Sequence, residues 1–500
     1  MAIFTRAQRG KAEAVRDLGY GNPFLPARKE AEQRALGDAF EPGEPVWSAA
    51  VDFEAARPNV DRIQAEVERL CAAGRGRLAG AGDAELALYA DLASYALYYR
   101  CYNGLLALSD GEREGEATDV PAGVWQTMRD GYAELLTVDG RPISPHSPGH
   151  LFAILFQTRR AFLQVFDRLI GGSPAAARLR ADVWQSIFTH DRDRHARHMF
   201  GRLRDIATLV TGESGTGKEI VAAAIARAQY RPFDERSRSF SPAGPFAPLN
   251  LSALPATLIE SELFGHKRGS FTGASTDRRG WLEQAGPFGC VFLDEVGETE
   301  PAVQVKLLRV LQERTFTRVG ETRERRFEGK VIAATNRDLP AEMAAGRFRA
   351  DLYYRLSGDL IRTPPLREQL AGDAGELLRL LTFAARRVVG PDAAADVASE
   401  AAECVERDLG PSYGWPGNFR ELEQCVRNVV VRRCYTPPRA NASDGLADHL
   451  DAAKLSADDL LDLYSRRAVE VHGSYSAAAR HIGLDRRTIK ARADRAATTA

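Results

Sequence analysis

The sequence is poor in the features that mark secreted, highly charged or membrane-bound proteins. Its 67 Lys and Arg residues nearly balance 68 Asp and Glu, so the net charge is only −1. Any affinity for nucleic acid must therefore come from a local basic patch. The N-terminal stretch MAIFTRAQRGKAEAV lacks an apolar signal-like core, and no run of about 18 apolar residues occurs in the chain. We expect a cytoplasmic protein that makes no membrane contact.

Cysteine is also scarce and irregularly placed. The six cysteines form no CxxC pair and no regular framework. This is typical of buried or incidental thiols in a reducing compartment. A metal cluster built from Cys404, Cys425 and Cys434 is a less favoured alternative.

The first third of the chain has a mostly helical pattern. A chain of 500 residues is too long for a single core, so we expect several domains. Before residue 169, Leu88, Leu92, Tyr95 and Tyr99 recur at helical spacing. Such a stripe usually belongs to a core and only occasionally lines a ligand pocket. We expect a helical regulatory region of unknown type, which is either a sensor or a scaffold for assembly.

From residue 206 the pattern changes to short apolar runs that alternate with helical segments, as in a parallel sheet covered by helices. IATLV predicts a strand, TGESGTGKE a glycine-rich turn, and the following residues a helix. In that context the spacing of Gly212, Gly217 and Lys218 matches the P-loop, whose backbone N–H groups and lysine hold nucleotide phosphates. The predicted ATP-binding residues are Gly212, Glu213, Ser214, Gly215, Thr216, Gly217, Lys218 and Glu219.

Two further apolar strands should complete a hydrolytic site. Glu219 occupies the position where the general P-loop motif has a Ser or Thr that meets Mg²⁺, so another carboxylate must hold the metal. The run CVFLDE supplies Asp294 as the metal ligand and Glu295 to polarise the attacking water. The run GKVIAATN ends in Asn336, at the place expected of a γ-phosphate sensor.

Taken in order, eight motifs resemble the sigma-54-dependent transcriptional activators, the bacterial enhancer-binding proteins among the AAA+ ATPases. They are GESGTGKE, SELFGHKRGSFTGA, VFLDEVG, QVKLLRVLQE, AATNRDL, FRADLYYRL, PPLRE and WPGNFREL. The resemblance covers about residues 169–435, and it accounts for Glu219 because the family carries glutamate there.

The resemblance implies roles for residues that the local pattern does not explain. Asn250 would hold Glu295 until the γ-phosphate is sensed. Arg349 and Arg355 would be arginine fingers in a neighbour's nucleotide site, and Arg420 the sensor arginine of the lid. Because a guanidinium offered in trans neutralises charge on the transferred phosphoryl group, hydrolysis would need a ring, which the family implies is a hexamer.

It also implies a task for the segment GHKRGSFTGA, which has no phosphate chemistry of its own. Glycines keep this loop flexible and Phe271 gives it an apolar tip, so it would contact sigma-54 through Gly269, Ser270, Phe271, Thr272, Gly273 and Ala274. The chain departs from the family's pattern in three ways: Ser270 replaces the first alanine of GAFTGA, Gln369 replaces an arginine, and insertions occur at about 184–205 and at 231–245.

The last segment predicts three helices, over residues 460–471, 476–482 and 485–494, with Gly483 at a turn and Asp485 as an N-cap. It resembles the Fis-type helix-turn-helix that ends many members of the family, and such units bind DNA as dimers. The predicted DNA-contacting residues are Arg486, Arg487, Thr488, Lys490 and Arg492. A basic, solvated terminal helix is the alternative.

The predicted fold class is multidomain: a mainly helical N-terminal region, an α/β AAA+ P-loop ATPase core with a small helical lid, and a C-terminal three-helix helix-turn-helix. The expected domains are the regulatory region (1–168), the nucleotide-binding subdomain (169–370), the lid (371–435), a linker (436–455) and the DNA-binding domain (456–500). Such a protein would bind double-stranded DNA upstream of its promoters and use ATP and Mg²⁺ to remodel the closed complex of the sigma-54 RNA polymerase holoenzyme.

Two alternatives remain open. An AAA+ remodeller of another class, such as a chaperone or a DNA-processing motor, would share the nucleotide site but not the GSFTGA loop. A DNA-binding repressor would carry a vestigial ATPase, but an intact Lys218, Asp294, Glu295, Arg349 and Arg355 argue against this reading.

Overall fold

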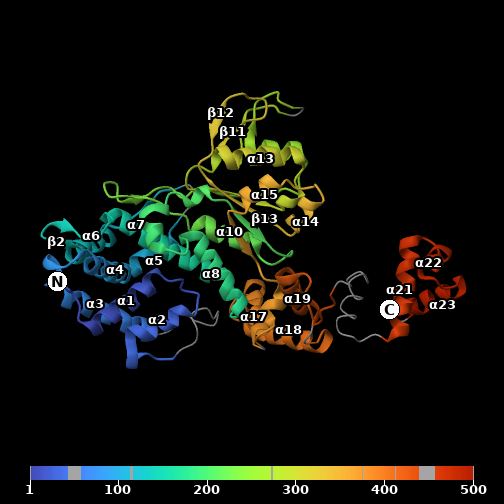
Figure 1. Ribbon diagram of the computed structural model, residues 1–500, viewed down its shortest axis with the longest axis horizontal. Coiled ribbons are helices and arrows are strands. Elements are labelled where there is room, and N and C mark those ends of the chain that lie inside the picture. The colour runs from blue at the N-terminus through green and yellow to red at the C-terminus, as the bar shows by residue number, and fades with distance from the viewer. Residues whose placement is uncertain are drawn as a thin grey trace. The chain divides into compact units, whose positions relative to one another are not determined.

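The computed structural model describes residues 2–42, 58–112, 116–271, 274–373, 375–410, 413–437 and 456–498 (Figure 1). The chain divides into two compact units, Met1–Cys434 and Tyr435–Ala500. Within the described ranges, no helix combines the length and the apolar character needed to cross a membrane.

Seven helices build the N-terminal part of the first unit, which confirms the predicted helical character of this region (Figure 1). Thr5 and Gln8 form a capping box at the start of the first helix, and Ser147 caps the seventh. Leu88 and Leu92 of the predicted stripe are buried in the core. The helices are α1 (Arg6–Tyr20), α2 (Ala27–Leu36), α3 (Pro58–Arg75), α4 (Asp83–Arg100), α5 (Tyr102–Asp110), α6 (Ala122–Leu136) and α7 (Pro148–Phe166), with a small hairpin of β2 (Thr137–Val138) and β3 (Arg141–Pro142).

The insertion at 231–245 joins the ATPase core to these helices. It forms β5 (Phe233–Asp234) and β6 (Ser239–Phe240), and β6 pairs with β1 (Thr118–Asp119) of the N-terminal part. Arg231 at its start is buried, donates to Thr118 Oγ1 at 3.0 Å and forms an ion pair with Glu112. The insertion is therefore a structural bridge between the two parts.

A five-stranded parallel sheet forms the middle of the unit, as the alternating pattern predicts. Its order is β14 (Asp359–Arg362), β4 (Thr208–Thr211), β13 (Lys330–Thr335), β10 (Cys290–Asp294) and β7 (Phe246–Asn250). Successive side chains of each strand enter opposite cores: Val210 and Phe292 pack with α8 (Pro174–Phe188) and α10 (Lys218–Arg227), whereas Leu209 and Val291 pack with α11 (Ala256–Phe264), α13 (Pro301–Glu313) and α15 (Ala350–Leu356). The three layers are those of an α/β P-loop core.

The remaining elements of the first unit lie around this sheet. The predicted lid range contains α17 (Glu376–Val389), α18 (Ala394–Asp408) and α19 (Asn418–Arg432), and the short helix α16 (Leu366–Leu370) precedes it. Shorter elements are α9 (Arg192–Arg194), β8 (Gly265–His266), β9 (Arg278–Arg279), α12 (Trp281–Gln284), β11 (Thr315–Thr317), β12 (Glu324–Arg326) and α14 (Leu339–Ala344). Cys404 and Cys425 are buried and Cys434 is exposed, and the described residues contain no group of three or more His, Cys, Asp or Glu side chains that could hold a metal ion.

The second unit consists of α21 (Ala457–His472), α22 (Tyr475–Ile482) and α23 (Arg486–Thr498). Gly473 and Gly483 end the first two of these helices with φ of 69° and 78°, a left-handed conformation that favours glycine. Ala478 and Ile489 are fully buried between the helices. Most of the expected linker, residues 438–455, lies outside the described residues, and the domain boundaries stay predictions.

Candidate nucleotide-binding site

The P-loop connects strand β4, which lies between β14 and β13 in the sheet, to helix α10, as the sequence predicts. Gly215 and Gly217 adopt φ of 79° and 88°, which turns successive backbone N–H groups toward the N-terminus of α10. Such a turn is an anion-binding concavity that adds to the positive end of the helix dipole. Thr216 is buried, and its hydroxyl lies 2.7 Å from that of Thr363 beside β14. The loop is therefore shaped for phosphate and anchored to its own sheet.

Lys218 is the buried cation of this loop. Its Nζ donates to the carbonyls of Gly212 and Glu213 at 3.0 and 3.1 Å. Burial lowers the pKa of the ammonium group, while the nearby carboxylates Glu295 and Asp294 act in the opposite direction. A phosphate oxygen is a stronger hydrogen-bond acceptor than a neutral carbonyl. The ammonium group can therefore exchange its two carbonyl partners for a phosphate ligand. Glu219, which follows it, is exposed in the first turn of α10.

The acidic pair lies at the C-terminal edge of the sheet, at the end of β10, which β13 separates from the P-loop strand β4. Asp294 ends β10 in register with Asn250 at the end of β7, and its Oδ1 accepts from the N–H of Glu295 at 3.0 Å. Glu295 has a left-handed backbone with φ of 55°. Carboxylate oxygens are ligands that Mg²⁺ prefers, so the residues at this edge fit the predicted metal.

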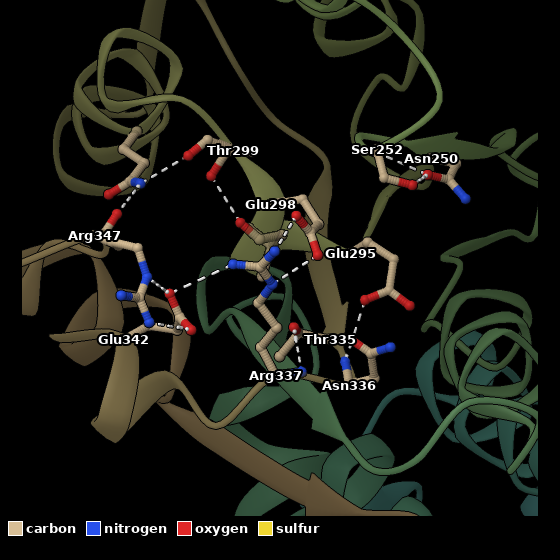
Figure 2. A network of polar contacts seen from close by, with 12 residues as sticks. Asn250, Ser252, Glu295, Glu298, Thr299, Thr335, Asn336, Arg337, Glu342 and Arg347 are labelled. Atoms are coloured by element: carbon tan, nitrogen blue, oxygen red, sulfur yellow. Dashed lines mark hydrogen bonds and ion pairs between the residues drawn. The ribbon is translucent and has the colours of Figure 1, made fainter. Parts of the chain in front are cut away.

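Figure 2 shows Glu295 beside Asn336, whereas Asn250 pairs with Ser252 and does not make the implied switch contact with Glu295. The backbone N–H of Asn336 donates to Glu295 Oε2 at 3.2 Å. The side-chain oxygen of Asn250 instead accepts from the N–H and the hydroxyl of Ser252, at 2.9 and 2.7 Å. In this structure Glu295 is held by the Asn336 backbone, and its pairing with Asn250 stays a prediction.

The lid closes over the P-loop through the turn that begins α19. Asn418 is fully buried, and its Nδ2 donates to the Ser214 carbonyl at 3.0 Å. Arg420 Nη1 donates to Ser214 Oγ at 3.2 Å. A Cβ on Gly215 would come within 2.4 Å of the Gly417 carbonyl, so only glycine allows this approach. Arg420 therefore lies beside the P-loop, and its role as a sensor arginine stays a prediction.

Two contacts at this closure were missed from the sequence. Arg367 of α16 forms a bidentate ion pair with Glu213, at 2.5 and 2.9 Å. Asn418 also donates to that carboxylate at 3.2 Å. The sequence placed Glu213 among the nucleotide ligands, whereas here its carboxylate joins the loop to the lid. WPGNFREL was part of the resemblance, but no local pattern marks its asparagine as a P-loop contact.

The two predicted arginine fingers are both exposed: Arg355 lies on α15 and Arg349 is the residue that precedes this helix. Arg349 forms an ion pair with Asp351 at 2.7 Å, while Arg355 has no hydrogen bond or ion pair with any residue that the structure describes. Neither contacts the P-loop of its own chain, in agreement with a role in a neighbouring subunit, which stays a prediction.

Gln304 of α13 connects the acidic strand to Arg349, and the sequence did not single it out. Its side chain is fully buried, and Nε2 donates to the carbonyls of Thr299 and Arg347 at 2.9 and 3.1 Å. Its Oε1 accepts from the N–H of Arg349 at 3.0 Å. Arg337 makes a second connection: it forms ion pairs with Glu298, which follows β10, and with Glu342, in the first turn of α14 (Figure 2).

Replacing Gln304 by leucine should lower the free energy of unfolding by about 2–4 kcal/mol, because buried carbonyl and N–H groups lose their partners. Urea unfolding followed by circular dichroism measures this change. Gln312→Leu, an exposed position on the same helix, is the matched control and should change stability by less than about 0.5 kcal/mol. Equal stability of the two variants would contradict the assigned contacts.

The predicted sigma-54 loop extends from the β8–β9 pair. Phe271 packs its ring edge-on against His266, with centroids 5.0 Å apart. Backbone bonds from Gly269 to Ala274 (2.8 Å) and from Ala274 to Phe271 (3.0 Å) close the loop. Thr272 and Gly273 lie outside the described residues.

Ser270, the departure from the family's hexapeptide, lies against the turn between β11 and β12. A Cβ on Gly320 of that turn would come within 2.6 Å of the Ser270 Cβ. The Ser270 hydroxyl is buried and has no hydrogen-bond partner among the described residues. Because an unpaired buried hydroxyl costs free energy, serine at this position should stabilise the fold less than alanine would.

The predicted DNA-contacting residues divide into two groups on α23. Arg486, Arg487 and Lys490 are exposed. Thr488 instead donates its N–H to Asp485 Oδ1 at 3.0 Å, as part of the helix cap. Arg492 forms ion pairs with Asp462 and Asp458 at 2.7 and 3.1 Å. The first three remain available to a partner, whereas the last two stabilise the unit itself.

Comparison with known proteins agrees with this geometry. Residues 192–362 match the family described as the Sigma-54 interaction domain. The Nif-specific regulatory protein of Azotobacter vinelandii is 44% identical over 312 residues, which are 59% of this chain and 56% of the relative. The anaerobic nitric oxide reductase transcription regulator NorR of Citrobacter koseri is 45% identical over 233 residues, or 45% of this chain and 41% of the relative. The chain thus spans about half the length of these curated relatives.

Among solved structures, NtrX from Brucella abortus aligns with 24% sequence identity and a TM-score of 0.39, over 71% of this chain and 76% of NtrX. The matched residues include the P-loop, the acidic pair, the GSFTGA loop and the two predicted arginine fingers. Residues 192–362 of this chain thus match the Sigma-54 interaction domain, and the relatives that share this region are transcription regulators.

Proposed function

We propose that this protein hydrolyses ATP to ADP and phosphate and uses the reaction to activate transcription by the sigma-54 RNA polymerase holoenzyme. The observation that carries the proposal is the sheet edge at which a lysine-bearing P-loop, the Asp294–Glu295 pair and Asn336 meet, within a domain that matches the Sigma-54 interaction family.

Each residue at this edge has a task that its contacts support. Lys218 and the P-loop N–H groups hold the β- and γ-phosphate oxygens. Glu295 orients the attacking water, and Asn336 fixes the direction of that carboxylate. Asp294 would hold Mg²⁺, which would supply charge neutralisation at the phosphates. Arg420 couples the position of the lid to the nucleotide site, because it donates a hydrogen bond to Ser214 of the P-loop.

Hydrolysis would be completed by a second copy of the chain. Arg349, just before α15, and Arg355, on α15, are exposed and do not contact the P-loop of their own chain. In a ring of six, each pair of arginines would serve the next subunit's site and neutralise charge on the transferred phosphoryl group. The GSFTGA loop would then present the resulting movement to sigma-54.

The experiment for this proposal is sigma-54 capture by the protein in a transition-state analogue complex. Purified protein with ADP, Mg²⁺ and aluminium fluoride should bind sigma-54, whereas protein with ADP alone should not. An AAA+ remodeller of another class would hydrolyse ATP but fail to bind sigma-54 in either state. A repressor with a vestigial ATPase would show no turnover.

We also propose that the second unit is a helix-turn-helix that binds upstream DNA as a dimer. Replacing Arg487 and Lys490 by alanine should weaken operator binding about 10-fold or more and reduce the dependence of log Kd on log salt concentration by about 1–2, because two phosphate-neutralising cations are lost. Fluorescence anisotropy over a salt series measures both values. An unchanged slope would mean that another surface contacts DNA, and unchanged ATP turnover is the control for folding.

A further inference from the structure

The N-terminal helices enclose a cavity of about 530 Å³ that is separate from the nucleotide site. Residues from α1, α2, α3, α4, α5 and α7 line it, with Asp61 of α3 among them, together with Trp184 of α8 and Arg192 of α9. This volume is within the range of small-molecule sites, about 300–1,000 Å³.

One wall of the cavity is a cluster of tyrosines on α4 and α5. The rings of Tyr95 and Tyr99 lie 5.0 Å apart, those of Tyr98 and Tyr99 5.1 Å apart, and those of Tyr99 and Tyr102 6.2 Å apart. Phe162 and Trp184 also line the cavity. Half of the predicted stripe, Tyr95 and Tyr99, therefore lines a pocket, while its leucines are core. Such walls favour a planar, apolar body.

Two guanidinium groups in the same cavity form no ion pair with a carboxylate among the described residues, although Asp167 interacts electrostatically with Arg159. Arg159 is only 4% exposed, its Nε has no hydrogen-bond partner, and its guanidinium lies 4.5 Å from the centre of the Tyr102 ring. Arg192 donates to Thr158 Oγ1 at 2.7 Å and to the Gly19 carbonyl, both neutral groups. Burial lowers its pKa to about 10, so it remains a cation at neutral pH.

Other arginines nearby show that these two are exceptions. Arg28 also lines the cavity but pairs with Glu32 at 2.9 Å, and the buried Arg160 pairs with Glu112 at 2.9 Å. The carboxylate of Asp91, which lines the cavity as well, accepts from the Tyr20 hydroxyl at 2.7 Å. A buried cation without an ion-pair partner is costly, and the cavity gives an anion access to both of them.

We propose that this cavity binds a small organic anion with an aromatic body, whose carboxylate or phosphate headgroup pairs with Arg159 and Arg192. The ring would lie against the tyrosine wall. The site would act on the ATPase directly, because α8 carries Trp184 into the cavity and packs Phe188 into one core with Val221 and Ile225 of α10, the helix that begins at Lys218. This makes the N-terminal region a sensor rather than only a scaffold.

The test compares three probes of one shape by isothermal titration calorimetry with the full chain: 1-naphthoate, 1-naphthyl phosphate and the neutral 1-naphthamide. At least one anion should bind about 10-fold or more tightly than the amide, a difference of about 1.4 kcal/mol. The tighter anion identifies the headgroup as carboxylate or phosphate. If the amide binds as tightly as both anions, or if neither anion binds at about 1 mM, the proposal is overturned.

A variant assigns the binding to the cavity. Arg159→Met keeps the length of the side chain, should remove the preference for the anion, and should leave binding of the amide unchanged. Arg168→Met removes an exposed arginine just beyond the end of α7 and should leave both affinities unchanged. Equal loss of anion binding in the two variants would mean that a surface site was measured. Arg159→Gln replaces the methionine variant if the latter fails to fold, and the same loss is expected of it.

Discussion

Replacing Lys218 by alanine should abolish ATP turnover, with a loss of at least about 100-fold, comparable to the removal of one charge-stabilising group from an active site. The buried ammonium group donates only to the carbonyls of its own loop, so no phosphate-binding cation remains on the loop after the substitution. Phosphate release from ATP in a coupled assay measures the change.

The matched control is Lys306→Ala, which removes an exposed lysine of α13 that pairs with Glu260. This variant should keep its turnover within about twofold, because exposed ion pairs contribute little. Undiminished turnover in the Lys218 variant would mean that the glycine-rich turn is not the phosphate site. Chelation of Mg²⁺ should reduce wild-type turnover in the same way.

Replacing Phe271 by alanine should leave ATP turnover within about twofold and reduce open-complex formation by about 100-fold. The ring contacts His266 at the base of its own loop and has no part in the contacts of the P-loop or the acidic pair. Because apolar anchors at the tip of a contact surface carry much of the binding energy, its loss should remove the hold on sigma-54. Permanganate footprinting of a sigma-54 promoter measures opening.

Val431→Ala is the control for this prediction, because it removes an apolar side chain that is 77% exposed on the lid helix α19. It should change neither turnover nor promoter opening. If the Phe271 variant still opens promoters, the loop has another task. If the Phe271 variant loses ATP turnover as well, the substitution acts on the ATPase ring and not on the contact with sigma-54.

The sequence predicted the local geometry of the P-loop better than the contacts between the P-loop and the lid. A strand, a glycine-rich turn and a helix follow one another directly, so Gly212, Gly217 and Lys218 could be assigned from local spacing. The contact of Asn418 with Ser214 joins residues that are about two hundred positions apart. It depends on how the lid folds back, which no local periodicity encodes.

The insertion at 231–245 and the tyrosine stripe also depend on packing between distant segments, which local sequence patterns do not predict. The segment 231–245 looked like a departure from a pattern, yet its strand pairs with Thr118 and Asp119 and holds the N-terminal helices. Tyr95 and Tyr99 share helical spacing with Leu88 and Leu92, but only the leucines are buried in the core. Periodicity identifies the inner face of a helix, whereas packing between helices decides whether that face meets a core or a cavity.

The measurement that tests the account most directly is promoter opening by sigma-54 RNA polymerase holoenzyme, with the full-length protein and either ATP or a non-hydrolysable analogue. We predict open complexes with ATP and none with the analogue, because the loop must be moved by hydrolysis. Opening that proceeds equally well with the analogue, or rapid ATP turnover without any opening on sigma-54 promoters, would contradict the account.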